Sequence, residues 1–346
     1  MKKLNRVLSL SAAAALALSL TACSGGTSGT ADTPAADNTS ASTGGSGDTY
    51  TVAVIKQMDH ASLDEIADAI AARLDEIAAE NGITIQYEVT SGQGDQTVLR
   101  QLADQAIADG VDAIIPIATT AAQVAAVSAE ESQTPVVFAA ISYPETADLT
   151  GIDYVTGTSD ALDTNLILDM MLAQNPDLQN VGLLYSLSEP NSEVPIADAK
   201  AYLDEKGIAY TEATANTNDE VIAAASSLIA DGVDAVFTPT DNIIMAAELA
   251  IYEDFINAGI PHYTGADSFV RNGAFATCGV NYTDLGAQTA DLAYQAMTEG
   301  MDSLEDYYQV AGGLITVNSE TAEALGIDTS VFDSMGEVAA VTTTEE

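Results

Sequence analysis

The sequence predicts an α/β protein of two similar lobes, each a parallel sheet flanked by helices, with a ligand cleft between the lobes. Strand-like and helix-like segments alternate along the chain, which is the rhythm of parallel sheets covered by helices on both faces. One phrase occurs twice, as IADGVDAIIPIATT at 107–120 and as IADGVDAVFTPTDN at 229–242. The stretch from about residue 50 onward is also too long for one small core and suits two lobes.

In the first half, the expected helix after the first strand shows its apolar face plainly. Large aliphatic residues stand at positions 63, 66, 70, 74 and 77, the spacing of one helix face, and Asn81-Gly82 ends that helix. The expected strands of this half are 50–55, 83–89, 112–117 and 135–141. The other expected helices are 96–109 and 121–130.

The second half continues in the same order. Its expected strands are 181–185, 209–213, 234–237 and 262–265. Its expected helices are 163–174, 192–205, 220–231 and 243–257.

The repeated phrase describes one structural unit used twice. In each copy a helix ends at Asp-Gly, where glycine suits the left-handed C-cap, and an apolar strand follows that ends in hydroxyl or acidic residues. Chance convergence is the alternative, but seven identical residues at comparable places favour two similar lobes. Open parallel sheets bind ligands beyond the carboxyl ends of their strands, so we expect two such edges to face each other.

The first residues have the pattern of a secretory signal. Lys2, Lys3 and Arg6 precede an apolar stretch at 7–20, and small residues follow it. The sequence Leu20-Thr21-Ala22-Cys23 resembles the lipobox of bacterial lipoproteins, in which the cysteine carries the lipid. The alternative is a plain signal peptide with an accidental cysteine. We expect residues 1–22 to be a lipoprotein signal peptide and lipidated Cys23 to anchor the protein to the extracytoplasmic face of the cell membrane.

The expected domain boundaries follow from composition and from the element order. Residues 23–49 lack large apolar side chains apart from the cysteine and should form a disordered linker. The first lobe is expected at 50–157 plus about 270–300, and the second at 158–269 plus about 301–335. Residues 336–346 are expected to be an acidic tail.

Charge and cysteine content exclude several classes of function. The chain has 52 acidic and 9 basic residues and a net charge of −43, so nucleic acid is not an expected partner. With Cys23 lipidated, Cys278 has no disulfide partner and should be a small buried hydrophobic residue. His60 and His262 are the only histidines, and no catalytic, metal-binding or phosphate-binding motif is present. We predict no enzyme, no metal and no cofactor, and a monomer.

Residues at the expected strand ends are the candidates for ligand binding, although each could simply cap a helix or form a turn. Few lysines or arginines lie there, so helix N-terminal amides and hydroxyls would hold an anionic group. Several acids at the same edges suit an ammonium group, and an amino acid carries both groups. A wider set of strand-end residues includes His60, Ser142, Ser188, Thr240 and Ser268. The selected ligand-binding residues are Asp59, Gln93, Thr119, Thr120, Tyr143, Glu189, Asn191, Ser192, Asp241, Asn242 and Asp267.

From Val52 to about Gly326 the chain resembles the ABC-transporter substrate-binding lipoproteins whose characterised members bind tryptophan and other aromatic amino acids. The matching phrases are HASLD at 60–64, GDQTVL at 94–99, ATTAAQ at 118–123, VTGTSD at 155–160, YSLSEPNS at 185–192, PTDN at 239–242, GVNY at 279–282 and DLG at 284–286. The resemblance implies a type I-like periplasmic-binding-protein fold with three crossings between the lobes, and delivery of the ligand to a membrane permease.

Carried over by position, the resemblance implies contacts to the polar end of an amino acid. The residues concerned are Thr119, Glu189, Asn191, Ser192, Asp241 and Asp267. Family members usually have Asp-Pro where this chain has Tyr143-Pro144, so Tyr143 could stack on a ring or block part of the pocket. Two other readings stay open: the same fold binding a nucleoside, a sugar or a branched-chain amino acid, and a surface lipoprotein that takes no part in transport.

Overall fold

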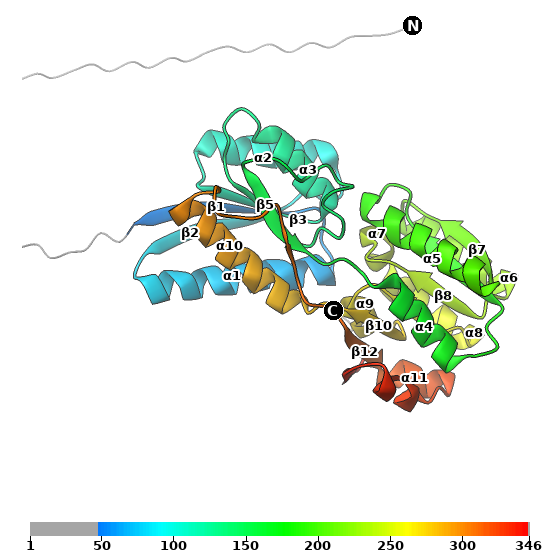
Figure 1. The fold of residues 1–346 in the computed structure, drawn as a ribbon. Helices are drawn as coiled ribbons and strands as arrows, with labels where there is room; N and C mark the ends of the chain where they lie inside the picture. The colour runs from blue at the N-terminus through cyan, green and yellow to red at the C-terminus, as the bar shows by residue number, and fades with distance from the viewer. Residues whose placement is uncertain (1–47, 345–346) are drawn as a thin grey trace, which may run out of the picture. The chain divides into compact units, whose positions relative to one another are not determined.

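The structure is a computed structural model that describes residues 48–344. The expected signal peptide, Cys23 and almost all of the expected linker lie outside the described residues. Two sheets form the core of the described chain (Figure 1). The first has six strands in the order β11-β5-β4-β3-β1-β2, and the second has seven in the order β13-β12-β10-β9-β8-β6-β7.

The first lobe is a parallel sheet between two pairs of helices. Its strands are β1 (Thr49–Lys56), β2 (Thr84–Ser91), β3 (Ala113–Ile117), β4 (Val136–Phe138), β5 (Val155–Ser159) and β11 (Tyr308–Gln309). Its helices are α1 (Ala61–Asn81), α2 (Gln96–Asp109), α3 (Thr119–Ser128) and α10 (Tyr282–Glu299). Helices α1 and α10 pack together on one face and α2 and α3 on the other (Figure 1). The periodic residues Leu63, Ile66, Ile70, Leu74 and Ile77 are all buried.

The second lobe repeats this arrangement with one antiparallel pair, β10 with β12. Its strands are β6 (Asn180–Tyr185), β7 (Ala209–Thr214), β8 (Ala235–Thr238), β9 (His262–Thr264), β10 (Ala276–Gly279), β12 (Leu314–Asn318) and β13 (Val338–Val341). Its helices are α4 (Thr164–Gln174), α5 (Glu193–Lys206), α6 (Asn218–Asp231), α7 (Asn242–Met245), α8 (Glu248–Ala258), α9 (Asp267–Arg271) and α11 (Ser319–Leu325). Two 3₁₀ turns, Pro190–Ser192 and Thr329–Ser334, complete it.

The two copies of the repeated phrase occupy equivalent places. Strand β3 lies between β1 and β4, and β8 lies between β6 and β9. The helix before each strand ends at a glycine in the left-handed conformation, Gly110 with φ 74° and Gly232 with φ 69°, as a C-cap requires. The predicted fold class, two lobes with similar parallel sheets, is therefore confirmed.

The strand pairing divides the chain differently from the expected lobe boundaries. Strand β10 lies within 270–300, which we assigned to the first lobe, but it pairs with β9 and β12 of the second. Strand β11 lies within 301–335, which we assigned to the second lobe, but it pairs with β5 of the first. Strand β13 lies in the expected acidic tail and pairs with β12. Paired strands can be far apart in the sequence, so local sequence patterns do not show which strands pair.

One expected helix also differs, and β5 is a strand that was not expected. The helix expected at 243–257 is interrupted, because α7 ends at Met245 and α8 begins at Glu248. Strand β5 was not among the expected strands, since VTGTS has no continuous apolar run, yet all five residues are buried. Cys278 is a free, buried cysteine as predicted, and burial raises the pKa of its thiol to about 11.

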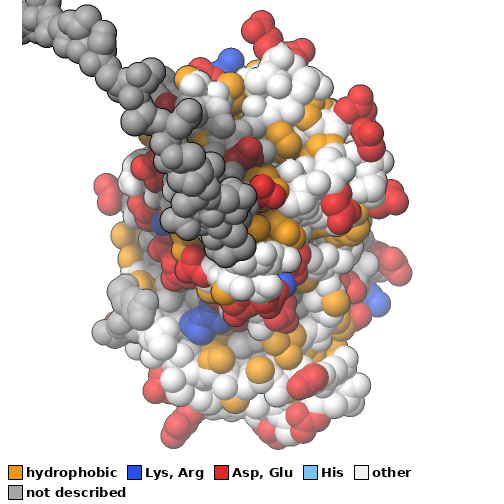
Figure 2. All heavy atoms as spheres, turned by 90° about the vertical axis from the view of Figure 1, so that its left-hand side faces the viewer, with side chains coloured by type: hydrophobic (Ala, Val, Ile, Leu, Met, Phe, Trp, Pro, Cys, Tyr) orange, Lys and Arg blue, Asp and Glu red, His pale blue; other side chains and the backbone are white. Residues whose placement is uncertain are grey.

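The surface agrees with the charge of the sequence. Acidic side chains are spread over the face in Figure 2, and basic ones are few. Among residues 48–344, no helix combines the length and the apolar character needed to cross a bilayer.

Candidate functional site

A small cavity lies between the lobes, where the carboxyl ends of strands from both sheets meet. Its volume is about 20 Å³, which is room for about one water molecule. The first lobe and the crossing segment contribute His60, Ser62, Leu63, Ile66, Ala118, Thr119, Ala140, Ser142, Asp160 and Tyr282 to its lining. The second lobe contributes Asn191, Thr240, Asp241, Asn242, Met245, Ala266 and Phe269.

Glu189 joins the two lobes beside this cavity. Nε2 of Gln57, which follows β1, donates a hydrogen bond of 2.7 Å to Oε1 of Glu189. Nδ2 of Asn242, at the start of α7, donates to Oε2. Burial, together with the nearby carboxyl of Asp241, raises the pKa of Glu189 to about 8, because a desolvated carboxylate is costly.

Asp241 holds its own lobe together. Its Oδ1 accepts from the amides of Ile243 and Ile244, both at 3.1 Å, so it is the N-cap of α7. Its Oδ2 accepts from the Ser186 amide and the Ser192 hydroxyl, both at 2.7 Å. Burial raises the pKa of Asp241. Because both oxygens are already used, Asp241 shapes the cavity wall and is not a free acceptor.

The carboxylate of Asp160 accepts fewer hydrogen bonds than that of Asp241. Asp160 directly follows β5, in a segment that crosses between the lobes, and is only 4% exposed. Oδ1 accepts from the Ser142 hydroxyl at 2.8 Å and Oδ2 from the Tyr282 hydroxyl at 3.0 Å. Burial raises the pKa of Asp160. A carboxylate with one short contact on each oxygen keeps lone pairs for a cationic group that enters the cavity.

The N-terminus of α3 reaches the cavity without a side-chain cap of its own. The cap residue is Ala118, with φ 77°, a backbone conformation that costs free energy for a residue with a Cβ. The amide of Thr120 donates to Oε1 of Gln57 at 3.1 Å, and Thr119 is buried against the cavity. Ala140, another cavity residue, also has positive φ, at 58°. Helix N-termini favour anionic groups.

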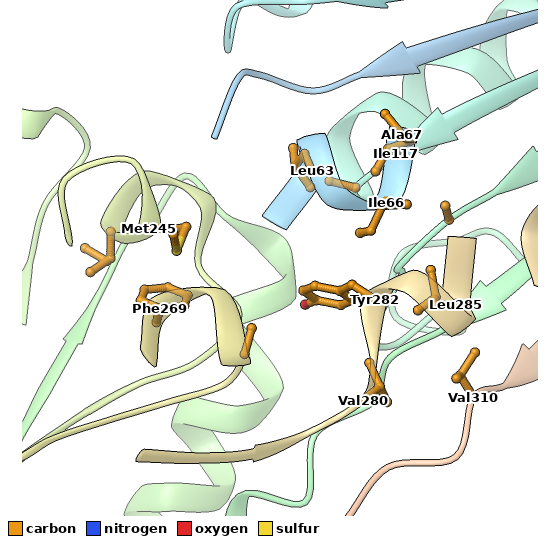
Figure 3. Close-up of a cluster of buried hydrophobic side chains, with 14 of the residues drawn as sticks. Leu63, Ile66, Ala67, Ile117, Met245, Phe269, Val280, Tyr282, Leu285 and Val310 are labelled. Carbon is orange, nitrogen blue, oxygen red and sulfur yellow. The ribbon is translucent and has the colours of Figure 1, made fainter. Parts of the chain in front are cut away.

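The remaining wall of the cavity is apolar. Figure 3 shows Met245 and Phe269 of the second lobe on one side, and Leu63, Ile66 and Tyr282 of the first lobe on the other. All five are at most 4% exposed. An apolar surface therefore stands beside the polar groups in one enclosed space.

The structure brings together seven of the eleven predicted ligand-binding residues. Thr119, Asn191, Asp241 and Asn242 line the cavity. Glu189 and Ser192 are hydrogen-bonded to the lining residues Asn242 and Asp241, and Thr120, next to Thr119, donates its amide to Gln57.

The other four do not line the cavity. Asp59 is exposed, lies 2.7 Å from Lys56 and accepts a hydrogen bond from Gln93. Asp267 forms an ion pair with Arg271 in the first turn of α9. The Tyr143 hydroxyl donates to the Leu162 carbonyl at 3.4 Å, beside the crossing segment.

Gln57, Asp160 and Tyr282 were not among the selected residues. Gln57 directly follows β1, and Asp160 directly follows β5. A position at the end of a strand, which identified Thr119, could therefore have identified Gln57. It could also have identified Asp160 if β5 had been among the expected strands. Within the described part of the chain, no three histidine, cysteine, aspartate or glutamate side chains are grouped to hold a metal ion.

A small cavity lined by both of two similar α/β lobes defines a two-lobed ligand-binding protein. The family model described as ABC transporter substrate binding protein matches residues 51–336. The chain belongs to this family of extracytoplasmic substrate-binding proteins.

Three relatives refine the comparison. A curated relative, the tyrosine-binding protein of Clostridioides difficile, is 27% identical over 251 residues, 71% of this chain and 72% of the relative. A Streptococcus pneumoniae ABC domain solved in complex with L-Trp is 26% identical with a TM-score of 0.76, covering 84% of this chain and all of that one. A ligand-free, open substrate-binding protein with adhesive properties from Clostridium difficile is 25% identical with a TM-score of 0.64, covering 85% of this chain and all of that one.

Identity and coverage are nearly equal for these two solved structures, but the TM-scores are 0.76 with the L-Trp complex and 0.64 with the open protein. As a whole, the chain therefore superposes better on the L-Trp complex than on the open protein.

Proposed function

We propose that this chain binds a free aromatic amino acid between its lobes and presents it to the permease of an ABC importer. The observation that carries the proposal is the cavity itself, which places an apolar wall beside a buried carboxylate and a helix N-terminus. A zwitterion with an apolar side chain needs these three features together. The ligands named for two of the relatives, tyrosine and L-Trp, support this choice over a nucleoside, a sugar or a branched-chain amino acid.

Different polar groups of the cavity would contact the ammonium group and the carboxylate of an amino acid. Asp160 and the Oδ1 atom of Asn191 would accept from the ammonium group, since Oδ1 is buried and has no partner among the described residues. The Thr119 hydroxyl and the first amides of α3 would hold the carboxylate. No lysine or arginine is among the described residues that line the cavity, so dipoles and hydroxyls would do this without an arginine clamp.

The lobes must separate for this ligand to enter. Ligand pockets are typically about 300–1,000 Å³, whereas this cavity is about 20 Å³. Contacts between the lobes would break on opening, among them those between Gln57 and Glu189, between His60 and Asn242 at 3.0 Å, and between Ser142 and Thr240 at 3.3 Å. A ligand that contacts both lobes would then favour a closed arrangement with a wider cavity than the present one, because an amino acid does not fit in about 20 Å³.

Mass spectrometry of small molecules released by denaturing freshly purified protein tests the ligand class. We expect an aromatic amino acid in the released fraction. A thermal-shift screen of amino acids, nucleosides and sugars is the second measurement, because only a ligand that prefers the native state raises the melting temperature. Stabilisation by a sugar or nucleoside alone would contradict the proposal.

We also propose that Cys23 carries the lipid anchor. A diacylated cysteine supplies two chains, enough for stable membrane attachment. Intact-mass measurement of the membrane-extracted protein should show the added lipid. Cys23→Ala should move the protein from the membrane fraction to the soluble extracytoplasmic fraction, and a variant that stays with the membrane would contradict lipidation at this residue.

A further inference from the structure

His60 carries a buried hydrogen-bonding atom that the fold does not use. It is the N-cap residue of α1, but its side chain makes no capping bond. Its Nε2 atom lies 3.0 Å from Oδ1 of Asn242. Its Nδ1 atom is buried and has no partner among the described residues, although His60 lines the interlobe cavity.

The neighbouring bonds determine which ring nitrogen carries the proton. Nδ2 of Asn242 donates to the carboxyl of Glu189, so the carbonyl oxygen of Asn242 is the atom that faces His60. A carbonyl oxygen only accepts, so Nε2 of His60 must be the donor. Burial lowers the pKa of His60 to about 4, so the ring is neutral at physiological pH and holds a single proton. Nδ1 is therefore a bare acceptor.

The position of His60 indicates which part of a ligand it would meet. His60, Leu63 and Ile66 follow one another at a spacing of three, so they lie along one side of the start of α1. Leu63 and Ile66 belong to the apolar wall of the cavity. The carboxylate of Asp160 and the N-terminus of α3 lie on other elements. His60 thus lines the same cavity as the apolar wall against which the side chain of a ligand would pack.

We propose that Nδ1 of His60 accepts a hydrogen bond from the ligand's ring, so that the protein selects aromatic amino acids bearing a ring N–H or O–H over phenylalanine. This inference rests on the proposed function and narrows its substrate class to tyrosine and tryptophan. A ring without a donor would leave Nδ1 desolvated and unpaired, and sites built for a hydrogen bond reject ligands that lack it.

Calorimetric titration of the full chain in mild detergent with L-tyrosine, L-tryptophan and L-phenylalanine tests this selection. In the wild type we expect dissociation constants for tyrosine and tryptophan roughly tenfold or more below that for phenylalanine, the scale of one unmet buried hydrogen bond. 1-Methyltryptophan, whose ring nitrogen carries no hydrogen, should bind less tightly than tryptophan by a similar factor.

Two substitutions of His60 separate its two nitrogens. His60→Gln keeps an amide donor near the position of Nε2, toward Asn242, and leaves no acceptor at the position of Nδ1. We expect the preference for tyrosine and tryptophan to fall close to one. His60→Asn is the matched control, since it keeps a polar group near the position of Nδ1 and loses the contact with Asn242. It should weaken all three ligands while the preference remains.

Equal affinity of the wild type for all three amino acids would overturn the inference and leave the proposed function intact. An unchanged preference in folded His60→Gln would overturn it as well. Should that variant not fold, the wild-type series with phenylalanine and 1-methyltryptophan decides alone. Binding of none of the aromatic amino acids would defeat the proposed function, and this inference with it.

Discussion

Gln57 of the first lobe donates a hydrogen bond of 2.7 Å to Glu189 of the second, and both side chains are at most 4% exposed. The other amide atom of Gln57 accepts from the Thr120 amide, and the other oxygen of Glu189 accepts from Asn242. The two residues therefore connect the N-terminus of α3 to the N-terminus of α7 through buried bonds alone. The bond between Gln57 and Glu189 can therefore form only when the two lobes are close together.

The protonation of Glu189 should make the stability of the closed form depend on pH. Its pKa is raised to about 8 from an ordinary value of 4.5, so the closed form binds a proton more tightly than the unfolded chain. The stabilisation is complete below the unfolded pKa and is lost as pH rises through the folded one. Wild-type melting temperature should thus fall between about pH 5 and pH 8 by more than that of Glu189→Gln. Glu88→Gln, which changes an exposed carboxylate, is the control and should follow the wild type.

Loss of the Asp160 charge should weaken ligand binding. Asp160→Asn keeps the size of the side chain and removes the negative charge proposed to face the ammonium group. Loss of one partner of a buried charge pair costs about 2–5 kcal/mol, and calorimetry should show a loss of affinity within this range. Asp163→Asn, three residues along in the exposed N-cap of α4, should retain wild-type affinity. Unchanged affinity in Asp160→Asn would remove this residue from the ammonium site.

Asp241→Ala should lower stability, because four donors lose their acceptor. Lost capping and unmet buried donors together suggest a decrease of about 2–4 kcal/mol in the free energy of unfolding. Urea denaturation measures this directly. Ligand affinity should also fall, by about 1–3 kcal/mol, as the cavity wall loosens. A variant with wild-type stability and reduced affinity would instead indicate a direct ligand contact.

His262 and Glu248 should stabilise the second lobe as a pair. Nδ1 of His262 lies 3.0 Å from Glu248 and Nε2 lies 2.8 Å from the Thr238 hydroxyl, all within the core. His262→Phe leaves the Glu248 carboxyl buried without its hydrogen-bond partner, and such an unmet buried polar group costs about 1–3 kcal/mol. The double variant His262→Phe with Glu248→Met should recover part of this loss in urea denaturation. Additive losses in the double variant would show that the two side chains do not act together.

Much of the fold could be predicted from local patterns. The helical spacing from Leu63 to Ile77 reports which face is buried, and glycines such as Gly110 report where helices end. The repeated phrase identified equivalent units in both lobes. Strand ends then identified Thr119 and Asp241 as neighbours of one cavity, because parallel strands place their carboxyl ends at one edge.

The roles of individual site residues could not be predicted in the same way. Asp241 and Asp160 are both acids that follow strands, but one is saturated by four donors and the other is not. Asp267 was selected for the same reason, but its Oδ2 is paired with Arg271 while its Oδ1 is buried without a partner among the described residues. The difference lies in the neighbours that each side chain acquires, and those neighbours are distant in sequence.

The amino-acid sequence by itself determined most of the helices and strands up to residue 265, the duplication and the edges at which ligand chemistry gathers, since these depend on periodicity and on residues close along the chain. Only the tertiary structure decided where the chain crosses from one sheet to the other and which carboxyl groups keep lone pairs free for a ligand. It also decided which nitrogen of His60 has no hydrogen-bond partner among the described residues. These depend on hydrogen bonds between residues as far apart as Gln57 and Glu189 or His60 and Asn242. Burial makes these hydrogen bonds important for stability, because a buried polar group without a partner costs free energy.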